Sequence, residues 1–474
     1  QNLLVRSQAL YPIELQAPFK IQRNYKIVFN CVFIYITIQM IQNILNINKN
    51  LFVNLLFAFI PISFIAGNLV LNINILLFIV LSIYICRKDV LIFKFHFFDK
   101  LIILFFSYVL FVGMYNFYLE DFKNKEILIK SFSFLRYLIL YFVIRILINN
   151  DKINFNLFFK FCSVSVLFVA SDLIFQYHFE KDIFGFEGQG RRLGGPFGDE
   201  LVAGSFLQRF SFFLFFLLLT SSFFKKNSSA INYVIFVILS LLVSFGLVLA
   251  GNRIPFIMFL ITAFLIFVFN RDNRIHFFSL IVVSIVALSI MYNTNLEIKY
   301  HYGHFQNKII NLFNSFSDER LIKKKESDKF KTFNEKYYSI EFNNKSYRMS
   351  SGYVLQFYSG YHTWKQNKIF GGGVKTFKFN CPKVFYNCAT HPHNYYLEIL
   401  SDLGIIGFLI ISLMGIYLIF KSFLIRNSII SPFIFLLISE LFPLKTTGSF
   451  FTTSNATYIF LILAIIAGFS FKKN

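Results

Sequence analysis

Two histidines near residue 391 are the clearest candidates for acid–base chemistry. They stand in the sequence His391-Pro392-His393-Asn394, directly before a long apolar segment. Imidazole titrates near neutral pH, so a histidine at this position can act as a general base. A structural histidine that caps the following helix is the alternative. The His-x-His spacing also suggests a metal ligand, but no adjacent carboxylate or cysteine pattern completes a zinc set, so we expect no metal.

Two further segments carry arginines in settings that suit an anion. Segment 191–197 (RRLGGPF) presents Arg191 and Arg192 beside a tight turn, and two guanidiniums can bind phosphate oxygens bidentately. Segment 251–255 (GNRIP) places Arg253 at the start of an apolar helix, where the helix N-terminus also favours anions. The alternatives are arginines that contact lipid headgroups in the first segment and an anchoring arginine in the second.

The composition indicates the environment of these residues. Of the 474 residues, 56% are hydrophobic and only 15% are charged. Soluble domains usually carry about 25% charged residues, so this chain is not an ordinary soluble globule, and it is neither disordered nor a disulfide-rich miniprotein. The formal net charge is +22, and in a membrane protein Lys and Arg report topology before they report a partner.

The apolar segments predict an all-α polytopic membrane protein. A bilayer core needs about 20 mostly apolar residues per helix. Twelve segments fit, several of them short: 51–66, 69–86, 101–118, 131–148, 157–177, 203–221, 231–249, 253–269, 277–293, 402–421, 428–446 and 455–471. A thirteenth segment, 27–45, is interrupted by Asn and Gln, and we interpret it as interfacial or poorly placed. The first twenty-odd residues look like neither a signal peptide nor a span.

Basic residues in the short loops orient these spans. They share one side of the membrane, which the positive-inside rule makes cytoplasmic, and an even number of spans returns both termini to that side. These residues are Arg87, Lys88, Lys94, Lys100, Lys225, Lys226, Arg271, Arg274, Lys421, Arg426, Lys472 and Lys473. The histidine and arginine segments therefore face outward.

We divide the chain into four parts. Residues 1–48 are an N-terminal segment of undefined role, 49–293 hold transmembrane helices 1–9, 294–395 form a large outward loop, and 396–474 hold helices 10–12. The large loop is strongly basic and is expected to contain short helical pieces separated by Gly and Asn turns. Its positive charge is not needed for topology, so it predicts an anionic partner. Nucleic acid is not expected at an outward membrane face.

Five ionisable side chains fall inside predicted spans, where they are costly and therefore candidates for function. Arg145 lies at the cytoplasmic end of its span and is expected to extend its guanidinium to the lipid headgroups. Arg136, Asp172, Arg209 and Glu440 lie toward the outward ends. They form either one buried ion-pair network or a polar cavity that opens outward.

The five cysteines divide into two groups. Cys381 and Cys388 flank a short loop immediately before the histidine motif. On an oxidising outward face they can form a disulfide that fixes His391 and His393. The other three lie in or near apolar segments and are expected to be inert packing residues: Cys31, Cys86 and Cys162.

Taken together, these motifs resemble the O-antigen ligase and O-antigen polymerase superfamily of bacterial inner-membrane glycosyltransferases. His393-Asn394, nine residues and then segment 404–407 (GIIG) are similar to the family's His, small polar residue, nine residues and Gly-x-x-Gly. Segment 192–197 resembles its Arg-x-x-Gly-x-Phe stretch, and segment 251–253 resembles its Gly-x-Arg turn. Segment 364–377 is similar to its aromatic and Gly-rich region.

The resemblance implies a GT-C-like membrane fold and a transferase at the periplasmic face of the bacterial inner membrane. The donor would be a polysaccharide on undecaprenyl pyrophosphate, and the acceptor a hydroxyl of the lipid A–core or another glycolipid. The reaction would need no cofactor and no metal and would invert the anomeric centre. The nine-residue spacing favours a ligase. The alternatives are an O-antigen polymerase that joins lipid-linked repeat units and, more distantly, a transporter or flippase of lipid-linked sugars.

The resemblance also implies roles for single residues. His393 would be the base that deprotonates the acceptor hydroxyl, and Arg192 and Arg253 would stabilise the departing pyrophosphate. Four further residues would bind substrate: Arg191, His391, Asn394 and Arg209.

Overall fold

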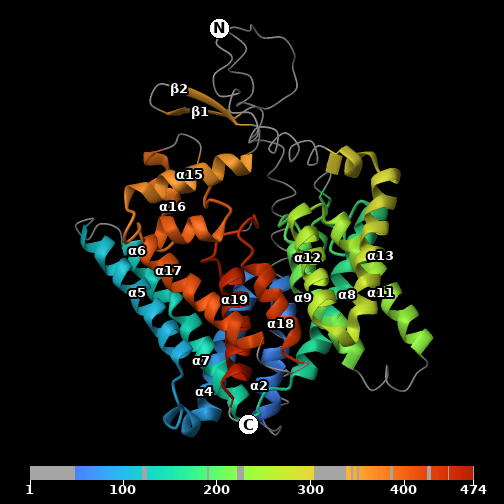
Figure 1. Cartoon of the computed structure of the whole chain (residues 1–474), viewed down its shortest axis with the longest axis horizontal. Helices are drawn as coiled ribbons and strands as arrows, with labels where there is room; N and C mark the ends of the chain where they lie inside the picture. Colours follow the sequence, from blue (N-terminus) through green and yellow to red (C-terminus); the bar gives the residue numbers. More distant parts are fainter. Residues whose placement is uncertain are drawn as a thin grey trace.

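The chain folds into a bundle of long helices, shown in Figure 1 as a computed structural model. The structure describes residues 49–119, 125–188, 192–220, 229–300, 302–303, 338–342, 345–349, 352–384, 388–423, 429–446 and 448–472. The predicted interfacial segment 27–45 and Cys31 lie outside these ranges. Each of the twelve segments predicted to span a membrane is helical over most of its length, which confirms the helical, multi-pass prediction.

The helices of the first half are α2 (Lys49–Ala58), α3 (Ile60–Ala66), α4 (Asn68–Leu91), α5 (Phe97–Leu119), α6 (Lys125–Phe134), α7 (Arg136–Asn149), α8 (Phe155–Phe179), the 3₁₀ turn η1 (Gly195–Phe197) and α9 (Ala203–Thr220). Those of the second half are α11 (Ser229–Leu249), α12 (Arg253–Phe269), η2 (Arg271–Asn273), α13 (Arg274–Thr294), α15 (Gly352–Gln366), α16 (Phe377–Asn380), η4 (Cys381–Lys383), α17 (Tyr395–Phe423), α18 (Ser431–Glu440) and α19 (Thr453–Ser470).

Within the described residues, nine helical segments are long and apolar enough to cross a membrane. The other three predicted spans are shorter: α12, α18, and the pair α2–α3, which is interrupted at Phe59. Two of the predicted boundaries that were wrong affect the site. The segment predicted at 402–421 begins seven residues earlier at Tyr395, and the one predicted at 428–446 is helical only to Glu440. The chain beyond Glu440 instead forms a polar connection that contributes to the site described below.

Consecutive membrane-length segments run in opposite directions, with α2 and α3 counted as one segment and α6 and α7 as another. The bundle therefore has two distinct ends. We call one the loop end, where α3, α5, α8, α11, α13 and α18 finish and α4, α6, α9, α12, α17 and α19 begin. It is the upper end in Figure 1, and the C terminus lies at the opposite end. Helices α15 and α16 sit above the loop end, as does an antiparallel hairpin of β1 (Tyr338–Phe342) and β2 (Lys345–Met349), which we did not predict.

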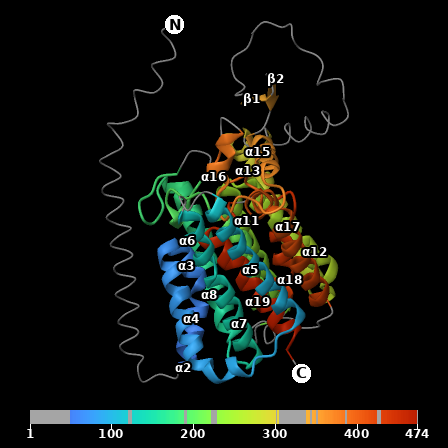
Figure 2. The same ribbon diagram turned by 90° about the vertical axis from the view of Figure 1, so that its left-hand side faces the viewer.

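The core is built largely from phenylalanine. Rings on α8, α9 and α18 meet where Phe213 lies 5.4 Å from Phe158 and 4.8 Å from Phe433, measured between ring centroids. Such offset and tilted contacts add to the free energy gained by burying the rings. Helix α19 runs through the middle, and it contacts α4, α7, α17 and α18. In Figure 2, α3 and α4 lie on one side of α19, and α12 and α18 lie on the other.

Candidate functional site at the loop end

The segment that contains Arg192 is held against α8 by polar side chains. Gln176 accepts a hydrogen bond from the backbone N–H of Gly195 (2.9 Å), and Gly195 has a positive φ of 53°. A side chain is disfavoured at this φ, which explains the glycine. Arg192 itself is half-buried, and its Nε has no hydrogen-bond partner among the described residues. Arg191 lies outside them.

Asp172 and Asp182 support the same loop. Asp172 accepts a hydrogen bond from the backbone N–H of Ile183 (2.9 Å), and Asp182 accepts one from that of Phe186 (2.6 Å). Burial raises the pKa of the Asp182 carboxyl to about 6, because the charged form is poorly solvated there. Asp172 therefore holds this loop in place. It does not belong to a buried ion-pair network with Arg209, which was one of the two alternatives for this residue.

Arg253 is the first residue of α12, and the turn before it touches the Arg192 loop. Asn252 donates a side-chain hydrogen bond to the carbonyl oxygen of Leu201 (3.0 Å), just before α9. Gly204 permits this approach, because a Cβ there would lie 3.0 Å from the Cβ of Asn252. Burial raises the pKa of Tyr302 to about 12, and the neighbouring Arg253 charge opposes that rise. The two arginine segments therefore adjoin each other at the loop end.

The two histidines lie together immediately before α17. Their ring centroids are 4.2 Å apart, and both residues are half-buried. The hydroxyl of Thr390 lies 3.0 Å from Nδ1 of His391. His393 adopts a φ of 54°, a left-handed conformation that a residue with a side chain seldom adopts. Such local strain is concentrated at functional sites. Here it lies in the turn that leads into α17.

Asn394 caps α17. Its side-chain oxygen accepts hydrogen bonds from the backbone N–H groups of Tyr396 (3.0 Å) and Leu397 (3.2 Å). Its amide nitrogen donates to the carbonyl oxygen of Pro443 (2.8 Å), in the connection between α18 and α19. Since both ends of the amide are engaged, this geometry favours a positioning role for Asn394 over the predicted contact with substrate.

Arg209 lies in a buried network between α9, α17, α18 and α19. Its guanidinium forms an ion pair with Glu440 at 2.6 Å, and Lys445 forms a second ion pair with the same carboxylate at 2.6 Å. Tyr395 donates to Glu440 at 2.9 Å, and Asn455 accepts from Arg209 at 2.8 Å. Arg209 is only 7% exposed, so the geometry favours a structural role for it rather than the predicted contact with substrate.

Burial lowers the pKa of Lys445 to about 8, although the Glu440 carboxylate opposes this change. Of the alternatives for the polar residues within spans, the ion-pair network is correct for Arg209 and Glu440. Arg136 lies apart from this network. It contacts the hydroxyls of Tyr137 (2.8 Å) and Thr453 (3.3 Å).

Helix α9 connects the three motifs. Its first turn contacts the Asn252 turn, and Arg209, five residues further along the helix than Gly204, contacts Tyr395 at the start of α17. The connection that receives the Asn394 hydrogen bond also carries Lys445, which contacts Gln208 of α9 at 3.5 Å. The Arg192, Arg253 and histidine segments are thus positioned by one continuous set of contacts at the loop end.

The Gly-rich segment docks onto a kink in α17. Gly404 has φ 67° and ψ −171° inside the helix, and the freed N–H of Ile405 donates to the carbonyl oxygen of Lys368 (2.9 Å). The backbone N–H groups of Gly372 and Gly373 donate to the carbonyl oxygens of Ser401 (3.0 Å) and Asp402 (2.8 Å). A Cβ on Gly371 would lie 2.5 Å from the backbone of α17, so only glycine fits this contact.

Asp402, which we did not predict as a site residue, completes this docking. Its carboxylate accepts hydrogen bonds from the backbone N–H groups of Lys375 (2.7 Å) and Phe377 (3.1 Å). On α5, Tyr108 donates to the carbonyl oxygen of Leu403 (2.8 Å), and Asn116 donates to that of Gly371 (3.1 Å). An acid two residues before Gly404 and five before Gly407 was the available sign of such a contact.

Cys381 and Cys388 are joined by a disulfide, the pair expected from the sequence. The residue after it, Ala389, donates its N–H to the side chain of Gln356 on α15 (3.4 Å). On the same helix, a Cβ at Gly360 would lie 2.8 Å from Cβ of Pro392, so α15 supports the histidine loop closely. Cys86 and Cys162 are buried free thiols, consistent with packing roles.

Arg145 corrects a prediction at the opposite end of the bundle. Its side chain is fully buried rather than extended to headgroups, and it pairs with Asp99 (3.3 Å) and Asn149 (2.7 Å). Its guanidinium also lies over the rings of Phe93 and Phe471, at 5.5 and 5.4 Å from their centroids. This pair is a structural feature of the C-terminal end and does not belong to the candidate site.

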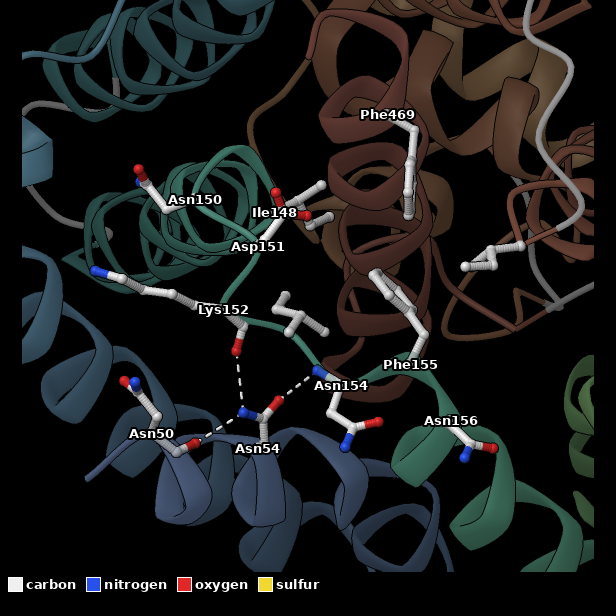
Figure 3. A pocket seen from close by; sticks show the side chains of 12 residues that line it. Asn50, Asn54, Ile148, Asn150, Asp151, Lys152, Asn154, Phe155, Asn156 and Phe469 are labelled. Atoms are coloured by element: carbon white, nitrogen blue, oxygen red, sulfur yellow. Dashed lines mark hydrogen bonds between the residues drawn. The ribbon is translucent and has the colours of Figure 1, made fainter. Parts of the chain in front are cut away.

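A cavity of about 730 Å³ also opens at the C-terminal end (Figure 3). The side chain of Asn54 lines this cavity. It donates hydrogen bonds to the carbonyl oxygens of Asn50 (2.8 Å) and Lys152 (3.0 Å) and accepts one from the backbone N–H of Asn154 (2.6 Å). The cavity lies at the far end from the histidine and arginine motifs. In the described part of the chain, no group of three or more His, Cys, Asp or Glu residues is arranged to hold a metal.

The fold and the site define a class: a multi-pass helical membrane protein with arginines and paired histidines gathered at one end of its bundle. Among known protein families, residues 235–412 match the family model described as O-Antigen ligase. The matched region includes Arg253, His391, His393 and the kinked Gly404 segment. No curated protein sequence matches the chain.

Proposed function

We propose that this protein is an O-antigen ligase that moves a polysaccharide from undecaprenyl pyrophosphate to a hydroxyl of the lipid A–core. The observation that carries the proposal is the linkage of the Arg192, Arg253 and His393 segments through α9 at the loop end, two of the three lying within the region matched by the family model. The match to this family model supports an enzyme of the ligase or polymerase type, and the family's description as O-Antigen ligase favours the ligase.

The proposed reaction is a single displacement. The acceptor hydroxyl attacks the anomeric carbon of the first sugar, and its proton passes to a ring nitrogen of His393. The new C–O bond forms as the bond to the pyrophosphate oxygen breaks, which inverts the anomeric centre. The lipid pyrophosphate leaves with the bonding electron pair, and Arg192 and Arg253 stabilise the charge that develops on it. His391 orients His393 or binds the acceptor, and Arg191 adds to the positive charge near the donor.

We place the loop end in the periplasm and the protein in the bacterial inner membrane. The basic residues in the described short loops, such as Lys94, Lys100 and Arg271, lie at the other end, which agrees with a cytoplasmic location for that end. On this proposal all twelve apolar segments cross the bilayer, the three shorter ones included, and residues 294–395 form the large periplasmic part. Membrane lipids and the glycolipid substrates are the partners, with no cofactor.

The test is a transfer assay with defined lipids. Purified protein is incubated with a polysaccharide on undecaprenyl pyrophosphate and with rough lipopolysaccharide, in the presence of EDTA. We expect a product in which the polysaccharide is attached to the lipid A–core. A product that forms without the rough lipopolysaccharide and contains longer lipid-linked chains would instead identify a polymerase. Dependence on an added divalent metal would contradict the metal-free mechanism.

A further inference from the structure

A second group of cations lies beside the candidate site, on the opposite side of α17 from the arginine segments. We propose that Lys375, Lys130 and Arg136 form a second anion-binding site, which holds a phosphate group of the acceptor lipid. The inference rests on the proposed function for the identity of the acceptor, but the site itself is argued from the contacts around Lys375.

The backbone holds Lys375 in a fixed and unusual position. Its φ is 59°, and its N–H donates to Asp402 at 2.7 Å. The preceding Gly373 packs against α6, where a Cβ on the glycine would lie 2.7 Å from Cγ2 of Ile127. A lysine held in a left-handed conformation costs free energy, and such strain persists where the surrounding structure fixes it. The turn therefore fixes the base of the lysine side chain beside α6.

The ammonium group of Lys375 lacks a close counter-ion. The residue is half-buried, and it forms no ion pair within 4.0 Å with another described residue. Burial and the neighbouring charges of Lys130, Arg136 and Lys378 lower its pKa, while Glu398 opposes that change. A half-buried cation among other cations is unfavourable by itself, and a bound anion would remove the penalty.

The nearby acids do not neutralise the group. Lys130 and Lys378 share one carboxylate, that of Glu126, at 2.6 and 3.5 Å. Glu398 is buried and already accepts a hydrogen bond from the N–H of Phe450 (2.5 Å). Arg136 contacts the hydroxyls of Tyr137 and Thr453 and lies over the ring of Tyr137, and its Nε has no hydrogen-bond partner among the described residues. The Asp402 carboxylate already accepts hydrogen bonds from the backbone N–H groups of Lys375 and Phe377. Counting Lys375, four cations thus face three carboxylates, which leaves a positive excess.

The position of this group matches a second substrate. Glu398, whose charge acts to raise the pKa of Lys375, lies in the first turn of α17, five residues after His393. In Figure 1, α6 lies to the left of α17 and α19, whereas α9 and α12 lie to the right. A donor pyrophosphate at Arg192 and Arg253 and an acceptor phosphate at Lys375 would therefore approach His393 from opposite sides. Phosphate is the shared chemistry of a phosphorylated lipid A–core and of a second lipid-linked pyrophosphate.

The test is a binding measurement with single lipids, so that no transfer takes place. The purified full chain in detergent is titrated with bis-phosphorylated lipid A, with dephosphorylated lipid A and with farnesyl pyrophosphate. Lys375→Met should weaken binding of the phosphorylated lipid A by about tenfold, whereas Lys375→Arg should bind like the wild type. Lys383→Met is the matched control, because Lys383 is exposed in η4 and its ammonium donates a hydrogen bond to the side chain of Asn380 (2.9 Å). Lys130→Met serves as a second variant if Lys375→Met does not fold.

The two phosphate sources give different results. If the acceptor is a lipid-linked pyrophosphate, the wild type binds two molecules of farnesyl pyrophosphate, and either Lys375→Met or Arg253→Met leaves one. The inference is overturned if Lys375→Met binds both phosphorylated probes like the wild type, or if it loses dephosphorylated lipid A to the same extent. Because binding is measured without turnover, a chain that binds through Lys375 but transfers nothing would refute the proposed ligase activity and leave this site standing.

Discussion

At the scale of single residues, the loop end depends on a buried charge network that is not balanced. Arg209 and Lys445 share the one carboxylate of Glu440, and the side chains of Lys445 and Glu440 are 6% and 1% exposed. Charges that have lost their water are tolerated only when they are paired and hydrogen-bonded. Because Arg209 lies on α9 and Tyr395 begins α17, this network fixes the distance between the arginine and histidine segments.

Glu440→Gln should therefore destabilise the protein strongly. The substitution leaves two cations buried without a counter-ion, which typically costs about 3–5 kcal/mol. Thermal unfolding in detergent would show a large fall in Tm. The matched control is Glu126→Gln, which also removes a carboxylate shared by two cations but at a surface where side-chain pairs contribute little. Equal changes in Tm for the two variants would show that the network does not stabilise the fold.

The single residues also show how far sequence reasoning reaches. The Cys381–Cys388 disulfide was predictable from two cysteines that lie close in sequence on an outward face, whereas the roles of Arg253, His391 and His393 stay predictions. The burial of Arg145 was missed because the predicted span began at residue 101 and left Asp99 in a loop. The helix begins at Phe97, which places Asp99 in its first turn, where it is buried and pairs with Arg145. A boundary error of four residues thus hid a buried ion pair.

At the scale of elements, the kink in α17 joins two motifs that are more than thirty residues apart in sequence. Gly404 breaks the helix, and the segment 368–373 fills the break with backbone hydrogen bonds. The glycines of both motifs were visible in the sequence, but hydropathy cannot show that one motif docks onto the other. The polar connection after Glu440 was missed for a similar reason, since its apolar residues extended the predicted span to residue 446.

Gly404→Ala should disrupt this joint. A Cβ would overlap the carbonyl oxygen of Ile369, and the φ of 67° adds roughly 1–2 kcal/mol of strain for any other residue. We expect a loss of stability of at least about 2 kcal/mol. Transfer should fall with it, because the kink lies in α17, the helix that begins directly after the histidine motif. Gly415→Ala is the control, since its Cβ would meet only the flexible end of Leu441 at 3.1 Å. A Gly404→Ala protein as stable and active as Gly415→Ala would refute the role of the kink.

At the scale of the whole molecule, the bundle separates two kinds of polar site. The loop end carries the histidines, the arginine segments and Lys375, while the C-terminal end carries the buried Arg145–Asp99 pair and a cavity lined largely by carboxamides. The helical core was predictable because apolar segments of bilayer length admit one solution, in which every backbone group bonds within its own helix. How the helices pack against one another was not predictable, because most of them are apolar on all sides and have no distinct inward face.

The orientation can be tested in intact cells. Lys365→Cys on α15 should react with a membrane-impermeant thiol reagent, because the loop end is proposed to face the periplasm. Arg271→Cys in η2 at the other end should react only after the inner membrane is permeabilised. Cys86 and Cys162 are buried and should give little background. The reverse labelling pattern would invert the topology and remove the site from the periplasm.

The central claim is that His393 takes the proton of the acceptor hydroxyl during glycan transfer, and the most direct test is the initial rate of transfer by His393→Ala. General-base catalysis contributes about 10²–10⁴-fold, so we predict a rate reduced by at least about a hundredfold, with an unchanged Tm. His178→Ala, which removes an exposed histidine at the same end of the bundle, should transfer at the wild-type rate. A folded His393→Ala protein that transfers the polysaccharide at the rate of His178→Ala would contradict the mechanism.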